Sequence, residues 1–174
     1  MQNNLIDMDS KQIRELQAPL KEKYREYPES AVVTLKASGR LEDGISCKIE
    51  TGQAMVKAGL HPATGGSGLA VCSGDMLLEA LVACAGVTMN AVATAIDCPL
   101  DDANITAEGD LDFRGTLGVS REAPVGFKEI RLHFDLKTDA SDEQISSLLK
   151  LTERYCVVYQ TLVSKPDITI SHNK

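Results

Sequence analysis

The sequence contains no tryptophan, and aromatic residues make up only 4% of its 174 residues. Proteins that recognise single-stranded RNA stack bases on such side chains, so this kind of surface is poorly supplied. Positive charge is also scarce, because 18 lysines and arginines are outnumbered by 25 aspartates and glutamates, which leaves a net charge of −7. Binding to nucleic acids depends on neutralising phosphates. The composition therefore argues against nucleic acid as a partner.

Sequence motifs for metal and phosphate binding are also missing. The three histidines, His61, His133 and His172, do not show the spacing of metal ligands, and there is no Cys-x-x-Cys pair. The glycine run GGSG at 65–68 is not followed by the Lys-Ser or Lys-Thr of a phosphate-binding loop. We therefore expect no bound metal or other cofactor. His61 lies in the glycine loop and could line a pocket, but we interpret it as a surface-loop residue.

The first residues, MQNNLIDMDS, lack the basic start and apolar stretch of a secretory signal, which predicts a cytoplasmic protein. The five cysteines are then expected to be reduced, with any disulfide transient and catalytic. Residues 76–96 are numerous enough to cross a bilayer, but they are rich in alanine and include Glu79 and Asn90. We expect this segment to be a buried helix and expect no association with a membrane.

Hydrophobic patterning predicts an α+β fold, with antiparallel sheets packed around two long helices. Strands are expected at 32–37, 45–50, 53–58, 104–117, 129–138 and 167–170, with a hairpin turn at 42–44. Helices are expected at 73–97 and 141–165, the second with a capping box formed by Ser141 and Gln144. A polar helix at 10–26 suggests a helical appendage at 1–28, followed by the main domain at 29–174.

Two cysteines lie on the apolar stripes of the long helices. The first stripe comprises Leu77, Ala80, Leu81, Cys84, Val87, Ala91 and Ala95. The second comprises Ile145, Leu149, Thr152, Cys156, Tyr159 and Val163. Both cysteines are thus placed in mid-helix on a buried face, and their sulfur atoms approach each other if the helices cross.

A buried free cysteine is ordinarily packing material with an inert thiol. The alternative is a redox pair, in which one thiolate is oxidised to a sulfenic acid and the other thiol condenses with it. Because neither Cys84 nor Cys156 is expected at a helix N-terminus, an arginine would have to stabilise that thiolate. Cys72, just before the first long helix, is an alternative resolving thiol, whereas Cys47 and Cys98 are interpreted as packing residues.

Three segments of the chain resemble the OsmC/Ohr family, the osmotically inducible protein C and organic hydroperoxide resistance protein relatives. They are GGSG at 65–68, SGDMLLEALVACAG at 73–86 and RYCVVYQTL at 154–162. The resemblance implies a peroxidase in which Cys84 attacks an organic hydroperoxide and Cys156 resolves the product as a disulfide. It also implies that Arg40, in a turn after the first strand, activates the thiolate. The nearest match to the glutamate that holds this arginine in the family is Asp75.

The resemblance further implies an OsmC-like fold that forms an intertwined homodimer. A helix that is apolar on nearly every side supports this, because one sheet face cannot cover it. The implied reductant is a dithiol, either a lipoyl group or a thioredoxin-like protein, and the apolar helix faces would select alkyl or fatty-acyl hydroperoxides. The alternative is a non-catalytic OsmC-like protein that binds a fatty acid or a similar apolar ligand.

Overall fold

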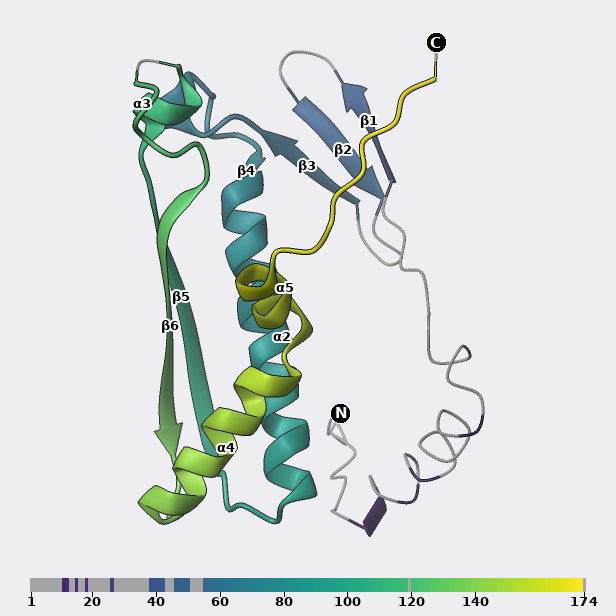
Figure 1. Ribbon diagram of the computed structural model, residues 1–174, viewed down its shortest axis with the longest axis vertical. Helices are drawn as coiled ribbons and strands as arrows, with labels where there is room; N and C mark the ends of the chain where they lie inside the picture. Colours follow the sequence, from purple (N-terminus) through teal and green to yellow (C-terminus); the bar gives the residue numbers. More distant parts are fainter. Residues whose placement is uncertain are drawn as a thin grey trace, which may run out of the picture. The chain divides into compact units, whose positions relative to one another are not determined.

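The computed structural model of the chain describes residues 38–42, 46–50, 55–118 and 120–173, together with a few helical positions before residue 27 (Figure 1). The chain forms two compact units. One consists of Met1–Arg14, Ala80–Ile105 and Phe134–Lys174, and the other of Glu15–Glu79 and Thr106–His133. The boundary predicted between an appendage at 1–28 and a main domain at 29–174 lies outside the described residues and stays a prediction.

A four-stranded sheet contains β1 (Ser38–Glu42), β2 (Ser46–Glu50), β3 (Met55–Gly59) and β4 (Val71–Cys72). β1, β2 and β3 are antiparallel neighbours, and β4 pairs in parallel with β3. The strand predicted at 32–37 lies outside the described residues. The prediction that Arg40 lies in a turn is wrong, because backbone pairing continues to Glu42 opposite Ser46 and places Arg40 in mid-strand opposite Lys48.

The helix α2 (Ser73–Ala95) follows β4 and carries Asp75 in its first turn, as predicted. Its buried side chains are Leu81, Ala85, Met89, Val92 and Ala93. The predicted stripe is therefore partly wrong, and its member Val87 is 74% exposed. An alanine-rich helix offers several apolar faces, so tertiary packing and not the sequence period selects the buried one. α2 is also long and apolar enough to cross a membrane. The core helix of a soluble protein can have the same length and composition.

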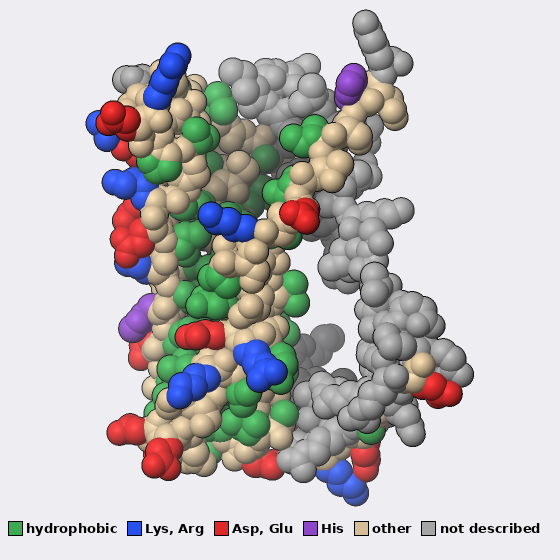
Figure 2. All heavy atoms as spheres, in the orientation of Figure 1, with side chains coloured by type: hydrophobic (Ala, Val, Ile, Leu, Met, Phe, Trp, Pro, Cys, Tyr) green, Lys and Arg blue, Asp and Glu red, His purple; other side chains and the backbone are tan. Residues whose placement is uncertain are grey.

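A two-stranded antiparallel sheet contains β5 (Asp102–Leu111) and β6 (Phe127–Lys137) (Figure 1). Side-chain exposure alternates strictly along β5, as predicted. On the exposed face, the Arg131 guanidinium pairs across the strands with Asp110 at 2.6 Å, within a band of charged side chains along this sheet (Figure 2). β5 ends earlier than predicted, because the Asp112 carboxylate accepts a hydrogen bond from the Arg114 N–H and caps the short helix α3 (Phe113–Thr116).

The second long helix is divided at Cys156 into α4 (Asp142–Tyr155) and α5 (Val157–Ser164). The capping box of Ser141 and Gln144 is present, as predicted. The expectation that Cys156 lies in mid-helix is wrong, because its backbone is extended and ends one helix while beginning the next. Two β-branched residues, Val157 and Val158, follow it directly, and such residues lower the propensity to continue a helix.

Two further expectations for the C-terminal region are wrong. Val163 is exposed rather than part of the buried stripe, whereas Leu148 is buried. Residues 167–170 do not form a strand, and the side chains of Ile168 and Ile170 are 83% and 91% exposed. Their alternating sequence can form a strand only beside a partner, and none of the described strands pairs with them.

One core cluster lies between α2, α4 and the ends of β5 and β6. Its buried members are Met89, Val92, Ala93, Cys98 and Leu148. Cys98 is thus a packing residue, as expected.

Truncating Leu148 to alanine should destabilise the protein. The side chain is 1% exposed, so Leu148→Ala loses its transfer free energy and leaves a cavity, and we expect a loss of about 3 kcal/mol. Urea denaturation measures this change. The neighbouring exposed residue offers a matched control, because Lys150→Ala should change the unfolding free energy by no more than about 0.5 kcal/mol. Equal effects of the two substitutions would contradict this assignment of the core.

Candidate functional site

The structure brings the sulfur atoms of Cys84 and Cys156 together. Cys84 lies in the middle of α2 and is half-buried, whereas Cys156 is buried at the junction of α4 and α5. Hydrogen bonding between the two side chains contributes to the pKa shifts of both, and both thiols are free. The expected crossing of the two helical segments therefore does juxtapose the cysteines.

The environment of Cys84 favours its thiolate. Burial opposes ionisation, but it is outweighed by hydrogen bonds donated by the Val158 backbone N–H, the Cys156 thiol, the Thr88 hydroxyl and the Val157 backbone N–H, so the pKa of Cys84 is lowered. Val157 and Val158 form the first turn of α5, where backbone N–H groups have no partner within the helix. The expectation that no helix N-terminus is available to this thiolate is therefore wrong.

The environment of Cys156 has the opposite effect. Burial raises the pKa of Cys156, the Tyr159 backbone N–H lowers it, and the hydrogen bond and negative charge of the Cys84 sulfur raise it again, with a net upward shift. The pair therefore shares its protons unequally. The lowered pKa of Cys84 and the raised pKa of Cys156 favour Cys84 as the member that ionises, with the Cys156 thiol as its hydrogen-bond donor.

Sequence reasoning missed the residues that stabilise this charge. Thr88 lies four positions after Cys84, a spacing that puts both side chains on one face of a helix, so the sequence did contain a signal for it. No such signal exists for the amides of Val157 and Val158. Their role depends on the break at Cys156, which the apolar period does not reveal.

The other predicted site residues lie elsewhere. Arg40 is in β1, and its side chain is outside the described part of the structure. Asp75 precedes Cys84 by nine residues in the same helix, which is about 13.5 Å along the axis and about two and a half turns, so the two lie on opposite faces. Among the described residues, only Cys84 and Cys156 of the predicted set come together.

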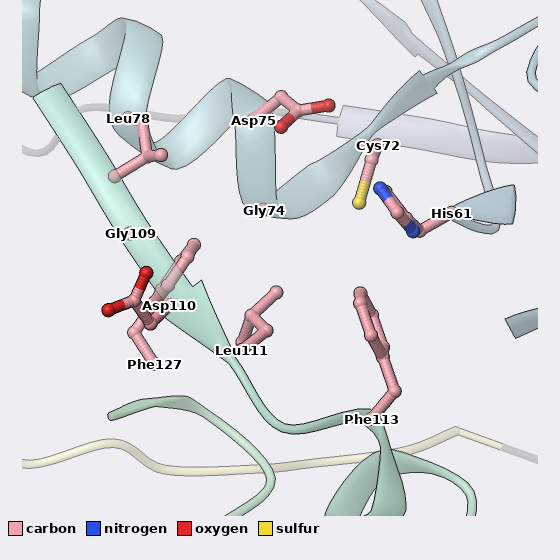
Figure 3. A pocket seen from close by; sticks show the side chains of 10 residues that line it. All are labelled: His61, Cys72, Gly74, Asp75, Leu78, Gly109, Asp110, Leu111, Phe113 and Phe127. Carbon is pink, nitrogen blue, oxygen red and sulfur yellow. The ribbon is translucent and has the colours of Figure 1, made fainter. Parts of the chain in front are cut away.

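Asp75 instead lines a pocket of about 340 Å³ beside the start of α2 (Figure 3). Cys72 and His61 line the same pocket, so His61 has the pocket-lining position that was the alternative to a surface-loop residue. The His61 ring stacks on Phe113, with ring centroids 4.8 Å apart. Within the part of the chain that the structure describes, no group of three or more histidine, cysteine and acidic residues could hold a metal ion.

The structure resembles several solved structures. An OsmC-like protein from Mycoplasma pneumoniae has a TM-score of 0.64 and 18% sequence identity, covering 75% of this chain and 88% of that chain. An organic hydroperoxide resistance protein OsmC from Legionella pneumophila has a TM-score of 0.59 and 19% identity, over 75% and 90% of the two chains. A putative organic hydroperoxide resistance protein from Vibrio cholerae, with captopril bound in one of its active sites, has a TM-score of 0.54 and 19% identity, over 75% and 86%.

No curated protein sequence matches the chain significantly. The sequence profile of OsmC-like proteins matches residues 65–171, which is more than half of the chain and includes both cysteines of the pair. This match and the similar folds confirm the family resemblance and the α+β OsmC-like fold. The chain belongs to the family of OsmC-like proteins.

Proposed function

We propose that the protein is a thiol peroxidase that reduces organic hydroperoxides, with Cys84 as the attacking and Cys156 as the resolving cysteine. The observation that carries the proposal is the hydrogen-bonded pair, in which the pKa of Cys84 is lowered. Attack on a peroxide requires a thiolate, and the α5 amides and Thr88 favour it here. Membership of the OsmC-like family supports the same chemistry, as do the hydroperoxide resistance proteins among the similar structures.

The first chemical step oxidises Cys84. Its thiolate attacks the distal oxygen of the hydroperoxide, the O–O bond breaks, and the alkoxide leaves as an alcohol after taking a proton. Cys84 becomes a sulfenic acid. We assign Arg40 the role of orienting the peroxide. We assign Asp75 the role of holding Arg40 in place, as the family resemblance implies.

The second step forms the disulfide. Cys156 attacks the Cys84 sulfur, the S–O bond breaks, and hydroxide leaves as water after protonation. Oxidation of Cys84 removes the negative charge that raises the pKa of Cys156, while the Tyr159 amide that favours its thiolate remains. The resolving thiol is therefore activated only after the first step. A lipoyl or thioredoxin-like dithiol then reduces the disulfide by exchange.

We also propose that two copies of the chain assemble as a homodimer in the cytoplasm. The support for a dimer is the apolar surface that α2 leaves uncovered, including Val87. The alternative is a non-catalytic protein that binds an apolar ligand. Such a function does not account for the lowered pKa of Cys84.

The pH dependence of Cys84 alkylation should reveal its hydrogen bonds. The alkylation rate follows the fraction of Cys84 that is thiolate, so it should rise with pH. Because the pKa of Cys84 is lowered, the midpoint of this rise should lie below the value of about 8.5 expected for a free thiol. Thr88→Val removes one donor, so the midpoint should move upward and alkylation at pH 7 should slow about fivefold. Iodoacetamide labelling, followed by peptide mapping, measures both.

Thr94 provides the matched control for this experiment. Its hydroxyl donates to the Asn90 carbonyl within the same helix and is not among the groups that act on Cys84. Thr94→Val should leave the alkylation profile of Cys84 unchanged. An unshifted profile in Thr88→Val would show that its hydroxyl does not stabilise the thiolate.

Steady-state turnover tests the proposed function itself. Reduced protein with excess dithiothreitol should consume many equivalents of cumene hydroperoxide and should use hydrogen peroxide less efficiently, because the apolar tail is buried on binding. Consumption is measured as the hydroperoxide that remains. A failure to consume hydroperoxide beyond the background rate of dithiothreitol would exclude the peroxidase and favour the ligand-binding alternative.

A further inference from the structure

The pocket at the start of α2 contains a second thiol site, which the proposed peroxidase chemistry does not use. Cys72, His61 and Asp75 line it together with the apolar side chains of Leu78 and Phe113 (Figure 3). All of these residues belong to one compact unit, whereas Cys84 and Cys156 belong to the other. Its volume of about 340 Å³ suits a small molecule.

The floor of the pocket leaves room beside the Cys72 sulfur because residue 74 is glycine. A Cβ atom at Gly74 would lie 3.6 Å from Cys72 Sγ and 3.5 Å from both Leu111 Cδ1 and Phe127 Cζ. A methyl group therefore fits there without a clash, and it would fill the space that a reagent needs to approach the sulfur. Cys72 itself is partly exposed and its thiol is free.

His61 has a defined tautomer that suits an anionic sulfur. Its Nδ1 accepts a hydrogen bond of 3.0 Å from the Ala63 backbone N–H, so in the neutral ring the proton resides on Nε2. Stacking on Phe113 restrains the ring. Figure 3 shows the ring beside the Cys72 sulfur on the wall of the pocket. His61 can therefore offer an N–H donor to a thiolate that forms there.

Asp75 gives the pocket a preference for positive charge. It lies in the first turn of α2, and Figure 3 shows its carboxylate turned toward the side of the pocket on which Cys72 lies. A second carboxylate, that of Asp110, also lines the pocket but already pairs with Arg131. Asp75 forms no ion pair among the described residues, so a cationic group on the ligand can pair with it in place of Arg40, its proposed partner in the peroxidase.

We propose that Cys72 is a site of reversible thiolation by small disulfides that carry an ammonium group, the class of aminothiol disulfides. The Cys72 thiolate attacks one sulfur of the disulfide, the S–S bond of the reagent breaks, and one aminothiol leaves as a thiolate that takes up a proton. The product is a mixed disulfide between Cys72 and the other half. The ammonium group pairs with Asp75, and the short apolar linker lies against Leu78 and Phe113.

The test compares three disulfides of similar size on reduced full-length protein that carries Cys84→Ser and Cys156→Ser. They are cystamine, which is cationic, bis(2-hydroxyethyl) disulfide, which is neutral, and dithiodipropionate, which is anionic. Peptide mapping measures the rate at which Cys72 acquires each half-reagent. We expect cystamine to react about fivefold faster than the neutral disulfide, because one ion pair at a partly exposed site contributes a factor of this size. The anionic reagent should be the slowest.

Three variants in this background separate the contributions. Asp75→Asn should abolish the preference for cystamine but not the reaction. Gly74→Ala should slow all three reagents, because its methyl group occupies the space beside Sγ. His61→Asn keeps a capping acceptor for the Ala63 N–H but removes the Nε2 donor, and it should slow all three as well.

The proposal would be overturned if the three disulfides labelled Cys72 at the same rate. It would also be overturned if Cys72 in the folded protein were labelled no faster than in the urea-unfolded chain. An unchanged preference in Asp75→Asn would overturn the role of its carboxylate. Because both cysteines of the peroxidase pair are absent from the tested protein, neither result depends on whether the protein reduces hydroperoxides.

Discussion

Replacing Cys84 by serine should lower the rate of cumene hydroperoxide reduction by a factor on the order of a thousand or more. A serine hydroxyl at this position keeps the size of the side chain, but it does not ionise near neutral pH, so the amides of Val157 and Val158 and the Thr88 hydroxyl would have no anion to stabilise. The loss should appear in the first turnover as well as in the steady state. Rapid mixing of equal amounts of protein and hydroperoxide measures the first turnover.

The control for Cys84→Ser removes a different cysteine. Cys98 lies in the core cluster and contacts neither member of the pair among the described interactions, so Cys98→Ala should retain the peroxidase rate as long as the protein is folded. Circular dichroism checks the fold of both variants. If Cys84→Ser kept more than about a tenth of the rate, Cys84 could not be the attacking nucleophile.

Replacing Cys156 by serine should separate the two steps of the reaction. Cys84 still reacts in the first turnover, although more slowly, because the thiol that donates a hydrogen bond to it is replaced by a hydroxyl. The sulfenic acid then has no resolving partner, so turnover with a dithiol reductant should fall by at least about a hundredfold. Trapping with dimedone should label Cys84 in this variant and not in the wild-type protein.

Two results would contradict the assignment of Cys156. Full steady-state turnover in Cys156→Ser would show that another thiol resolves the sulfenic acid, and Cys72 is the residue to examine first. Absence of dimedone labelling, together with intact peroxide consumption, would show that the reaction does not pass through a sulfenic acid at Cys84. The same rapid-mixing and mapping experiments give both answers.

The strands and helices that pack one face against a core could be predicted from periodicity. β5 illustrates this well, because its apolar and charged residues alternate and its exposure alternates in the same way. The capping box of Ser141 and Gln144 likewise fixes the start of α4 through local hydrogen bonds. In both cases the information lies within a few neighbouring residues.

The features that distinguish the cysteine pair depend on tertiary structure and escaped prediction. The apolar stripe continues through Cys156 without interruption, so the period gives no sign that the helix breaks there and begins again at Val157. In α2, the alanine-rich sequence does not indicate which face is buried, and Val87 of the predicted apolar stripe is exposed. The pocket around Cys72 combines His61, the N-cap of η2 (Pro62–Thr64), with residues of β4, α2, β5, α3 and β6, which no local pattern connects.

The most direct test of the central claim is the mass of the intact, reduced protein after addition of one equivalent of cumene hydroperoxide. If Cys84 and Cys156 form a reactive pair, the protein should lose two hydrogens, and peptide mapping should place the new disulfide between these two residues. Cys84→Ser should show no such change. An unchanged mass in the wild-type protein, or a disulfide that does not include Cys84, would contradict the proposed peroxidase mechanism.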